Sequence, residues 1–272
     1  MTLAVPVLMY HHVCPNPGLV TVSPETFEEH VAYLARRGYA ALAADAFLEF
    51  LQGKRPLTGR NVLITFDDGY LDNYVYAYPI LKRYGLKATI FAVTGNIGAG
   101  AARTYLGAGK SLPVTPDHRA CKAAVMDGRA DEVMLRWSEI EAMEASGAVE
   151  IHSHTHSHVR WNQLFPDKAQ RLAAVEDDLT ISRGELKRHL GKDSCHLCWP
   201  WGYFEPEYQG IAANLGFKAQ YATTRGVNIA GGDTQRIARL VAKDRPPGWL
   251  ATRMLIFQNA ALGRFYCRLR GD

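Results

Sequence analysis

The decapeptide Asn61-Val-Leu-Ile-Thr-Phe-Asp67-Asp68-Gly69-Tyr70 combines a short apolar run with two adjacent acids. Residues 62–64 are apolar and mostly β-branched, which predicts a strand buried on both faces of a sheet. Asp67 and Asp68 stand at its end, and Gly69 lets the backbone turn. Because neighbouring carboxylates repel each other, we interpret one as a metal ligand and the other as a proton acceptor. The alternative is a solvated turn in which an Asp caps a helix.

Strand and helix patterns alternate along the chain, which predicts an α/β protein with a parallel sheet. The expected strands lie at 5–10, 62–64, 88–93, 149–151, 195–199, 219–222 and 237–241. We therefore expect a single domain built as a distorted (β/α) barrel of about seven parallel strands. His11, the Asp67–Asp68 pair, His154 and the segment 200–202 lie just past the ends of expected strands, so a barrel would bring them to one face.

Four histidines occupy alternate positions in seven residues, at His152, His154, His156 and His158. In an extended chain all four share one face, whereas in a helix or turn only those four residues apart do. Both His152/His156 and His154/His158 have the spacing of two ligands of one metal. One Asp and two His leave coordination positions open, as in a catalytic metal site. An incidental polar turn is the alternative.

Composition sets limits on partners and location. The chain has 272 residues, is 47% apolar and carries a net charge of +4, too little to predict nucleic-acid binding. Its five cysteines show no disulfide framework, the N-terminus lacks the features of a signal peptide, and no stretch approaches about 18 uninterrupted apolar residues. We expect a cytoplasmic protein that does not span a membrane.

Two segments stand apart from the expected domain, which covers residues 1–248. Periodicity fails at about 95–129, which predicts a long loop insertion. Residues 249–272 predict a C-terminal amphipathic basic helix, because apolar residues recur at helical spacing while Arg264 and Arg268 fall one turn apart. Such a helix suits peripheral contact with an anionic membrane at its inner face. The alternative is a closing helix packed on the barrel.

Two motifs carry a family resemblance. Thr65-Phe-Asp67-Asp68-Gly69 resembles the first motif of the polysaccharide deacetylases, carbohydrate esterase family 4, whose fold is the NodB-homology domain. The segment 153–158 resembles their second motif, His-Ser/Thr-x-x-His. The resemblance implies that Asp67 is the general base and that Asp68, His154 and His158 bind one divalent metal. These mixed ligands favour Zn²⁺, with Co²⁺, Ni²⁺ or Mn²⁺ as alternatives.

A third segment, Cys198-Trp199-Pro200-Trp201-Gly202, resembles the family's Arg-x-Pro-x-Gly motif, which lines the substrate groove. Cys198 stands where the family has Arg, so another group must orient Asp67. The expected substrate-binding residues in this segment and directly after it are Pro200, Trp201, Gly202 and Tyr203.

The family's last motif supplies a general-acid His near the C-terminus, but this chain has no His after His196. The opening Pro6-Val-Leu-Met-Tyr10-His11-His12-Val13 is similar to that of the circularly permuted poly-β-1,6-N-acetylglucosamine deacetylase branch. The resemblance implies that His11 is the general acid, with His12 as the alternative. In the same branch an Arg before the last strand can replace the motif-three Arg; Arg239 fits best, with Arg236 as the alternative.

The resemblance implies a metal-dependent hydrolase that removes N-acetyl groups from an amino sugar in a polysaccharide or lipid-linked glycan. The alternative is an inactive deacetylase-like module that binds glycan or acts as a scaffold. The pair Cys195 and Cys198 also suggests a zinc or redox site. Residues three apart on a strand point to opposite faces, which argues against this pair as a site.

Overall fold

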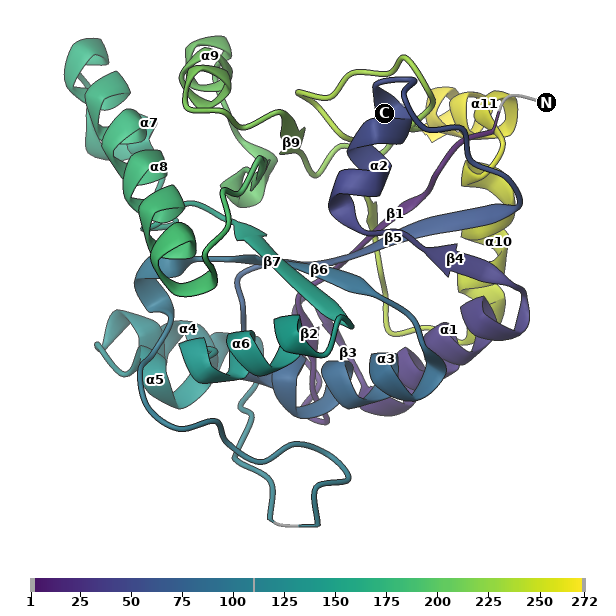
Figure 1. The fold of residues 1–272 in the computed structure, drawn as a ribbon, viewed down its shortest axis with the longest axis horizontal. Helices are drawn as coiled ribbons and strands as arrows, with labels where there is room; N and C mark the ends of the chain where they lie inside the picture. The colour runs from purple at the N-terminus through teal and green to yellow at the C-terminus, as the bar shows by residue number, and fades with distance from the viewer. Residues whose placement is uncertain (1–2, 110, 271–272) are drawn as a thin grey trace.

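The computed structural model describes residues 3–109 and 111–270, and a curled parallel sheet forms its centre (Figure 1). Every strand pair in this sheet is parallel. The strand order is β10 (Leu240–Val241), β1 (Val7–Tyr10), β5 (Arg60–Phe66), β6 (Ala88–Ala92), β7 (Val149–Ser153), β8 (His196–Cys198) and β9 (Ala219–Tyr221), and β4 (Tyr39–Ala41) pairs with β5 beside this path. The expected distorted barrel of seven parallel strands is confirmed.

The segment 234–242 connects the two edges of the sheet. On one side Ile237 donates its backbone N–H to the carbonyl of Gln220 in β9, at 2.9 Å. On the other side Ala242 donates to Met9 in β1, also at 2.9 Å. The curled sheet is thereby closed into a distorted barrel, and Arg239 lies at the closure.

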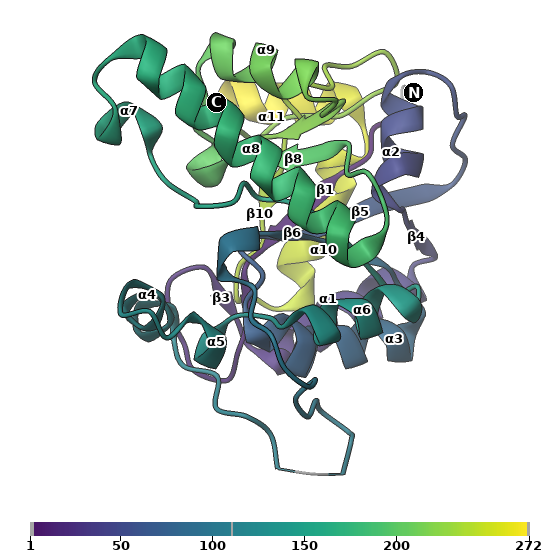
Figure 2. The same ribbon diagram turned by 60° about the vertical axis from the view of Figure 1, so that its left-hand side comes forward.

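Helices cover the outside of the sheet, because alternate side chains of each strand point outward. In β5, Val62, Ile64 and Phe66 belong to the outer core, whereas Leu63 belongs to the interior cluster. Figures 1 and 2 show helices on both sides of the sheet. These helices include α1 (Pro24–Arg36), α3 (Tyr78–Tyr84), α6 (Trp137–Ala145), α8 (Lys168–Leu190), α9 (Pro206–Asn214) and α10 (Pro247–Phe257). The shorter elements are β2 (His12–Val13), β3 (Thr21–Val22), the π-helix η1 (Asn73–Ala77), α5 (Ala130–Val133), α7 (Trp161–Leu164) and the 3₁₀ turn η3 (Pro200–Gly202).

The helix α2 (Ala44–Leu51) packs against the barrel interior at the amino ends of the strands. Its Phe47 and Leu51 join Leu63, Phe91 and Tyr221 in one buried cluster. This apolar packing thus closes the interior at the amino end of the barrel, on the side away from the carboxyl ends of the strands.

Two expected segments differ from the structure. The insertion at 95–129 is not wholly a loop, because it contains the end of η2 (Thr94–Asn96) and all of α4 (His118–Met126). The predicted single helix at 249–272 is wrong: α10 ends at Phe257, and α11 (Ala260–Arg270) begins after a break. The Asn259 side chain accepts hydrogen bonds from the N–H groups of Ala261 and Leu262, at 3.0 and 3.2 Å, and so caps the second helix. Residues 271–272 lie outside the described residues.

Candidate active site

A cavity of about 450 Å³ opens at the carboxyl ends of the strands. It brings together six of the residues predicted for the site from the sequence. These are His11, Asp67, Asp68, His154, His158 and Trp201. They come from segments after β1, β5, β7 and β8, as a barrel with one functional face requires.

Asp67 is held by a buried arginine from the far end of the chain. Arg239 donates from Nη1 to Asp67 Oδ1 at 2.6 Å and from Nη2 to Oδ2 at 2.8 Å. The same guanidinium donates to the carbonyl of Ala222, at 2.8 Å, and lies 3.1 Å from Cys198 Sγ. The residue that contacts the expected base is therefore Arg239, while Arg236 is exposed. Cys198, at the family's Arg position, packs against this replacement guanidinium.

The charge of Asp67 follows from this pairing. Burial by itself raises the pKa of Asp67, but Arg239, His154 and His11 lower it, and the net shift is downward. A bidentate pair also fixes the carboxylate plane. Asp67 is therefore ionised and oriented, as a general base has to be.

Asp68, His154 and His158 form a compact group that could hold a metal ion. Both His Nε2 atoms lie 3.3 Å from Asp68 Oδ1, and the three ligand atoms lie within 4.8 Å of one another. The Nδ1 of His154 is 2.7 Å from the Cys198 carbonyl, which can only accept, so Nδ1 carries the proton and Nε2 presents its lone pair. One carboxylate and two imidazoles fit a divalent transition metal with open positions.

Backbone strain is concentrated at this site. Among the described residues, the non-glycine residues with positive φ are Val20, Asp68, Thr155, His158 and Trp201. Four of them line the cavity, and Thr155 lies between His154 and His158 in the chain. Left-handed backbone costs energy outside glycine and is retained mainly where surrounding structure enforces it. This distribution supports the carboxyl end as the functional end.

The turn that carries His158 is fixed by a residue of α8. Asp178 Oδ1 accepts the N–H of His156 at 2.6 Å, and Oδ2 accepts the N–H of Ser157 at 3.0 Å. Thr155 Oγ1 accepts the N–H of His158 at 3.1 Å. These bonds fold the chain back, so that His158 faces His154. Asp178 was not predicted from the sequence; its one signal is an acidic residue on a helix that follows the motif.

The structure separates the two histidine pairs that spacing alone left open. His154 and His158 have ring centroids 4.9 Å apart beside Asp68. His156 instead contacts Thr94 Oγ1 through Nδ1 at 3.0 Å. His152 lies inside the barrel at the other end, with Nδ1 at 2.9 Å from Ser194 Oγ.

His11 borders the cavity, while its neighbour His12 does not. His11 Nε2 is 3.9 Å from Asp67 Oδ2, and burial lowers its pKa against the opposing influence of Asp67 and Asp68. His12 is fully buried, with Nδ1 at 2.6 Å from Asp72 and Nε2 at 3.1 Å from Nδ1 of His118. Of the two candidate acids, His11 is the one within reach of a substrate.

Of the residues in and directly after the third motif, Trp201 lines the cavity, and the others do not line it. Trp201 lines the cavity and packs on His158, with ring centroids 4.4 Å apart. Gly202 has φ of +67°, and a Cβ there would lie 2.6 Å from the backbone N of Thr223, so only glycine fits. Pro200 is buried, and the Tyr203 hydroxyl donates to Glu205, so neither lines the cavity.

The helix α4 forms another wall of the active-site cavity. It contributes His118, Lys122, Val125 and Met126, and Met126 is 85% exposed at the rim. The sequence assigned this region to a loop and gave no role to the last three residues. The wall is thus part polar and part apolar.

Comparisons with known proteins support this fold and the family resemblance. Residues 54–220 match the family model of polysaccharide deacetylases. The chain is 30% identical over 222 residues to YxkH of Bacillus subtilis (strain 168), covering 81% of this chain and 65% of that protein. It is 24% identical over 229 residues to the poly-β-1,6-N-acetyl-D-glucosamine N-deacetylase of Staphylococcus aureus (strain MRSA252), covering 82% of this chain and 68% of the relative.

The fold is also that of a solved structure. IcaB from Ammonifex degensii superposes with a TM-score of 0.74 at 24% identity, over 94% of this chain and 98% of the other. The curled parallel barrel and the acid–histidine site define a chain of the carbohydrate-deacetylase class. This protein belongs to the polysaccharide deacetylase family.

Proposed function

We propose that this chain is a metal-dependent hydrolase that removes N-acetyl groups from an amino-sugar glycan. The observation that carries the proposal is the Asp67 carboxylate, buried and paired with Arg239, beside the ligand set of Asp68, His154 and His158. An ionised base next to three candidate metal ligands at an open cavity is an arrangement that can catalyse amide hydrolysis with a metal-activated water. The names of the relatives support the same reaction class.

Each residue has a chemical role in this proposal. A divalent metal held by Asp68, His154 and His158, most readily Zn²⁺ and otherwise Co²⁺, Ni²⁺ or Mn²⁺, would polarise the amide carbonyl and lower the pKa of the attacking water. Asp67 takes the proton from that water as it attacks the carbonyl carbon. Arg239 keeps the carboxylate ionised and aimed.

His11 is the proposed general acid. It gives a proton to the amine nitrogen as the C–N bond breaks, and acetate leaves as the other product. His11 Nε2 is 3.9 Å from Asp67, so the proton that Asp67 accepts can pass to His11 with a small movement of either group.

The cavity walls suit a sugar polymer. Trp201 presents an aromatic surface that is 42% exposed, and aromatic rings pack well on the C–H faces of pyranoses. Val125 and Met126 add apolar surface on the other side, while His118 and Lys122 offer polar contacts. We propose an acetylated amino-sugar glycan, polymeric or lipid-linked, as the substrate.

Location remains a separate proposal. Among the described residues, no helix is both long and apolar enough to cross a membrane. Helix α11 exposes Leu262, Phe265 and Leu269, which share one helix face because they are three and four residues apart. With the arginines of the same helix beside them, we propose peripheral contact with an anionic membrane. The cytoplasmic location stays a prediction.

Acetate release tests the function. The metal-loaded chain is incubated with a panel of acetylated glycans and sugar-lipids, and acetate is measured for the native chain and for Asp67→Asn. Hydrolysis of at least one amino-sugar substrate, lost in Asp67→Asn with metal content retained, is the expected result. Glycan binding without any acetate release would instead identify an inactive binding module.

A further inference from the structure

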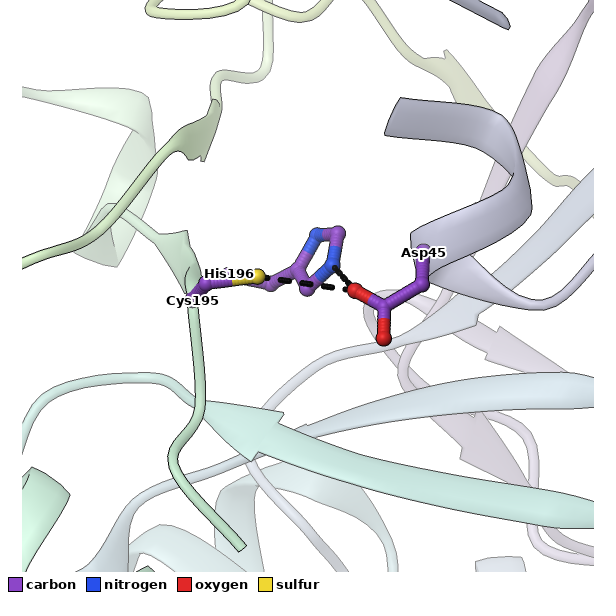
Figure 3. A group of neighbouring side chains, drawn as sticks. All are labelled: Asp45, Cys195 and His196. Atoms are coloured by element: carbon purple, nitrogen blue, oxygen red, sulfur yellow. Dashed lines mark hydrogen bonds and ion pairs between the residues drawn. The ribbon is translucent and has the colours of Figure 1, made fainter. Parts of the chain in front are cut away.

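A second cluster of metal-ligand atoms lies at the amino end of the barrel. Figure 3 shows Cys195 and His196, at the start of β8, facing Asp45 at the start of α2. Asp45 Oδ1 is 2.8 Å from His196 Nε2 and 3.5 Å from Cys195 Sγ. The three ligand atoms lie within 4.8 Å of one another. In a tetrahedral zinc site, with bonds of about 2.0–2.3 Å, ligand atoms are roughly 3–4 Å apart, so this spacing needs little adjustment.

The histidine is held ready for coordination. His196 is fully buried, and its Nδ1 lies 3.2 Å from the Tyr221 hydroxyl. A partner on Nδ1 fixes the ring plane and aims Nε2 at Asp45, as second-sphere partners of metal-bound histidines do. The Asp45 side chain is 74% exposed, which gives an ion a path from solvent.

One ring nitrogen of a buried imidazole beside the cluster lacks a hydrogen-bond partner. His152 Nε2 is buried and makes no hydrogen bond among the described residues; Glu150 Oε2 lies 3.8 Å away, beyond hydrogen-bond distance. The rings of His152 and His196 are 4.5 Å apart. His152, Asp45 and Glu150 also line one cavity of about 340 Å³. Buried polar atoms are normally satisfied, so a nitrogen without a hydrogen bond, on a residue that lines a polar cavity next to three ligand atoms, points to a missing partner.

We propose that Asp45, Cys195 and His196 bind a second divalent transition metal, of the zinc class. A mixed oxygen, sulfur and nitrogen donor set selects such ions over Mg²⁺ or Ca²⁺. The Cys195 thiol loses its proton to water on coordination. The site is separate from the catalytic one, because β8 begins with His196 and ends with Cys198, whose carbonyl contacts His154. A metal here joins α2 to β8 across the barrel end and stabilises the folded chain. The proposal does not depend on the proposed function.

The test uses Co²⁺, whose bond to a thiolate gives a charge-transfer band in the near ultraviolet. It is done in the full-length His154→Ala variant, where the catalytic ligand set is broken. After chelation, titration with Co²⁺ should produce the band and saturate at one ion per chain. The band should be lost in His154→Ala/Cys195→Ser. It should remain in His154→Ala/Cys198→Ser, the matched control, in which the other cysteine of β8 is changed.

A second variant, Asp45→Asn, tests the same metal site if Cys195→Ser does not fold. Asp45 is exposed, so Asp45→Asn in the His154→Ala background should fold, and its titration midpoint should move to higher Co²⁺ concentration. Absence of the band in His154→Ala, its persistence after Cys195→Ser, or an unchanged midpoint in Asp45→Asn would each overturn the second site.

Discussion

Arg239 follows Asp67 by 172 residues in the chain, yet its guanidinium makes both hydrogen bonds of a bidentate pair with that carboxylate. Both side chains are buried, Arg239 at 1% and Asp67 at 2% exposure. The pairing depends on the closure of the sheet, since Arg239 directly precedes β10, which pairs with β1. The proposed general base is thus oriented by the segment that completes the barrel.

Replacing Arg239 should impair the base. In Arg239→Met the Asp67 carboxylate keeps its burial but loses its counter-charge, so its pKa rises. A carboxylate with a higher pKa ionises only at higher pH, and the acid limb of the kcat/KM profile should therefore move to higher pH. We expect kcat/KM to fall by about 100-fold or more, and Tm to drop, because breaking a buried pair costs about 3–5 kcal/mol.

Arg236→Met is the matched control for that experiment. Arg236 is exposed, and its replacement should change neither the pH profile nor Tm. A profile that is unchanged in Arg239→Met would show that the acid limb does not report Asp67.

Metal binding should follow the pair His154/His158 and not the alternating histidines in general. His154→Ala removes a ligand whose Nε2 is 3.3 Å from Asp68, so zinc content should fall by one equivalent per chain and activity should be lost. His156→Ala changes a side chain that bonds to Thr94, and zinc content should stay the same. Elemental analysis of the two variants gives the answer; equal losses would show that the ligand set is different.

Asp178 is expected to act as a positioning residue. In Asp178→Asn the side chain can no longer accept both N–H groups of the His158 turn, so His158 should lose its fixed position. We predict a loss of metal affinity of about 10- to 100-fold, as for other supporting contacts of metal ligands. Asp177→Asn, on the exposed side of the same helix, is the control. Restored activity at high Zn²⁺ concentration would separate weakened metal binding from a general folding defect.

The parts of the site that sequence could predict are those that lie within one segment. Asp67, Asp68 and the histidine motif each follow a strand, and parallel strands bring their carboxyl ends together whatever the details of packing. The choice between His154/His158 and His152/His156 required the backbone turn, which is set by Asp178 on another helix. Spacing therefore left both pairs open.

Other features depend on contacts that no local pattern encodes. Asp45 meets Cys195 and His196 only because α2 closes the barrel end, some 150 residues away in the chain. The cavity wall formed by α4 could not be predicted, because the Gly and Pro residues on either side of this short helix are typical of a loop. Asn259 interrupts the terminal helix by capping α11, although apolar spacing continues across it.

His152 should make stability depend on pH. Burial and the neighbouring His196 lower the pKa of His152 to about 4, against about 6.5 in an unfolded chain. The unfolded state then binds the proton more readily, so this contribution is present above about pH 6.5 and is lost as pH falls to about 4. One such group changes the free energy of unfolding by at most about 1.4 kcal/mol per pH unit.

The corresponding measurement is urea unfolding between pH 4 and 7 with a chelator, for the native chain and for His152→Asn. The variant should lose less stability on acidification. Parallel pH curves for the two proteins would exclude His152 as a source of the dependence.

The proposed membrane contact should depend on α11 and not on α10. Leu250, Met254 and Phe257 of α10 are buried, so deleting residues 249–272 would remove core packing and could not test binding alone. Phe265 and Leu269 are 61% and 69% exposed, and the double change to Asp removes apolar surface and adds negative charge. Co-sedimentation with anionic vesicles at low salt should weaken by about tenfold or more.

Ile181→Asp, at a 47% exposed position on α8, is the control and should bind vesicles like the native chain. Equal sedimentation of the native chain and the α11 variant would exclude α11 as the membrane-binding surface. Phe265 and Leu269 affect vesicle binding only if this helix contacts the membrane.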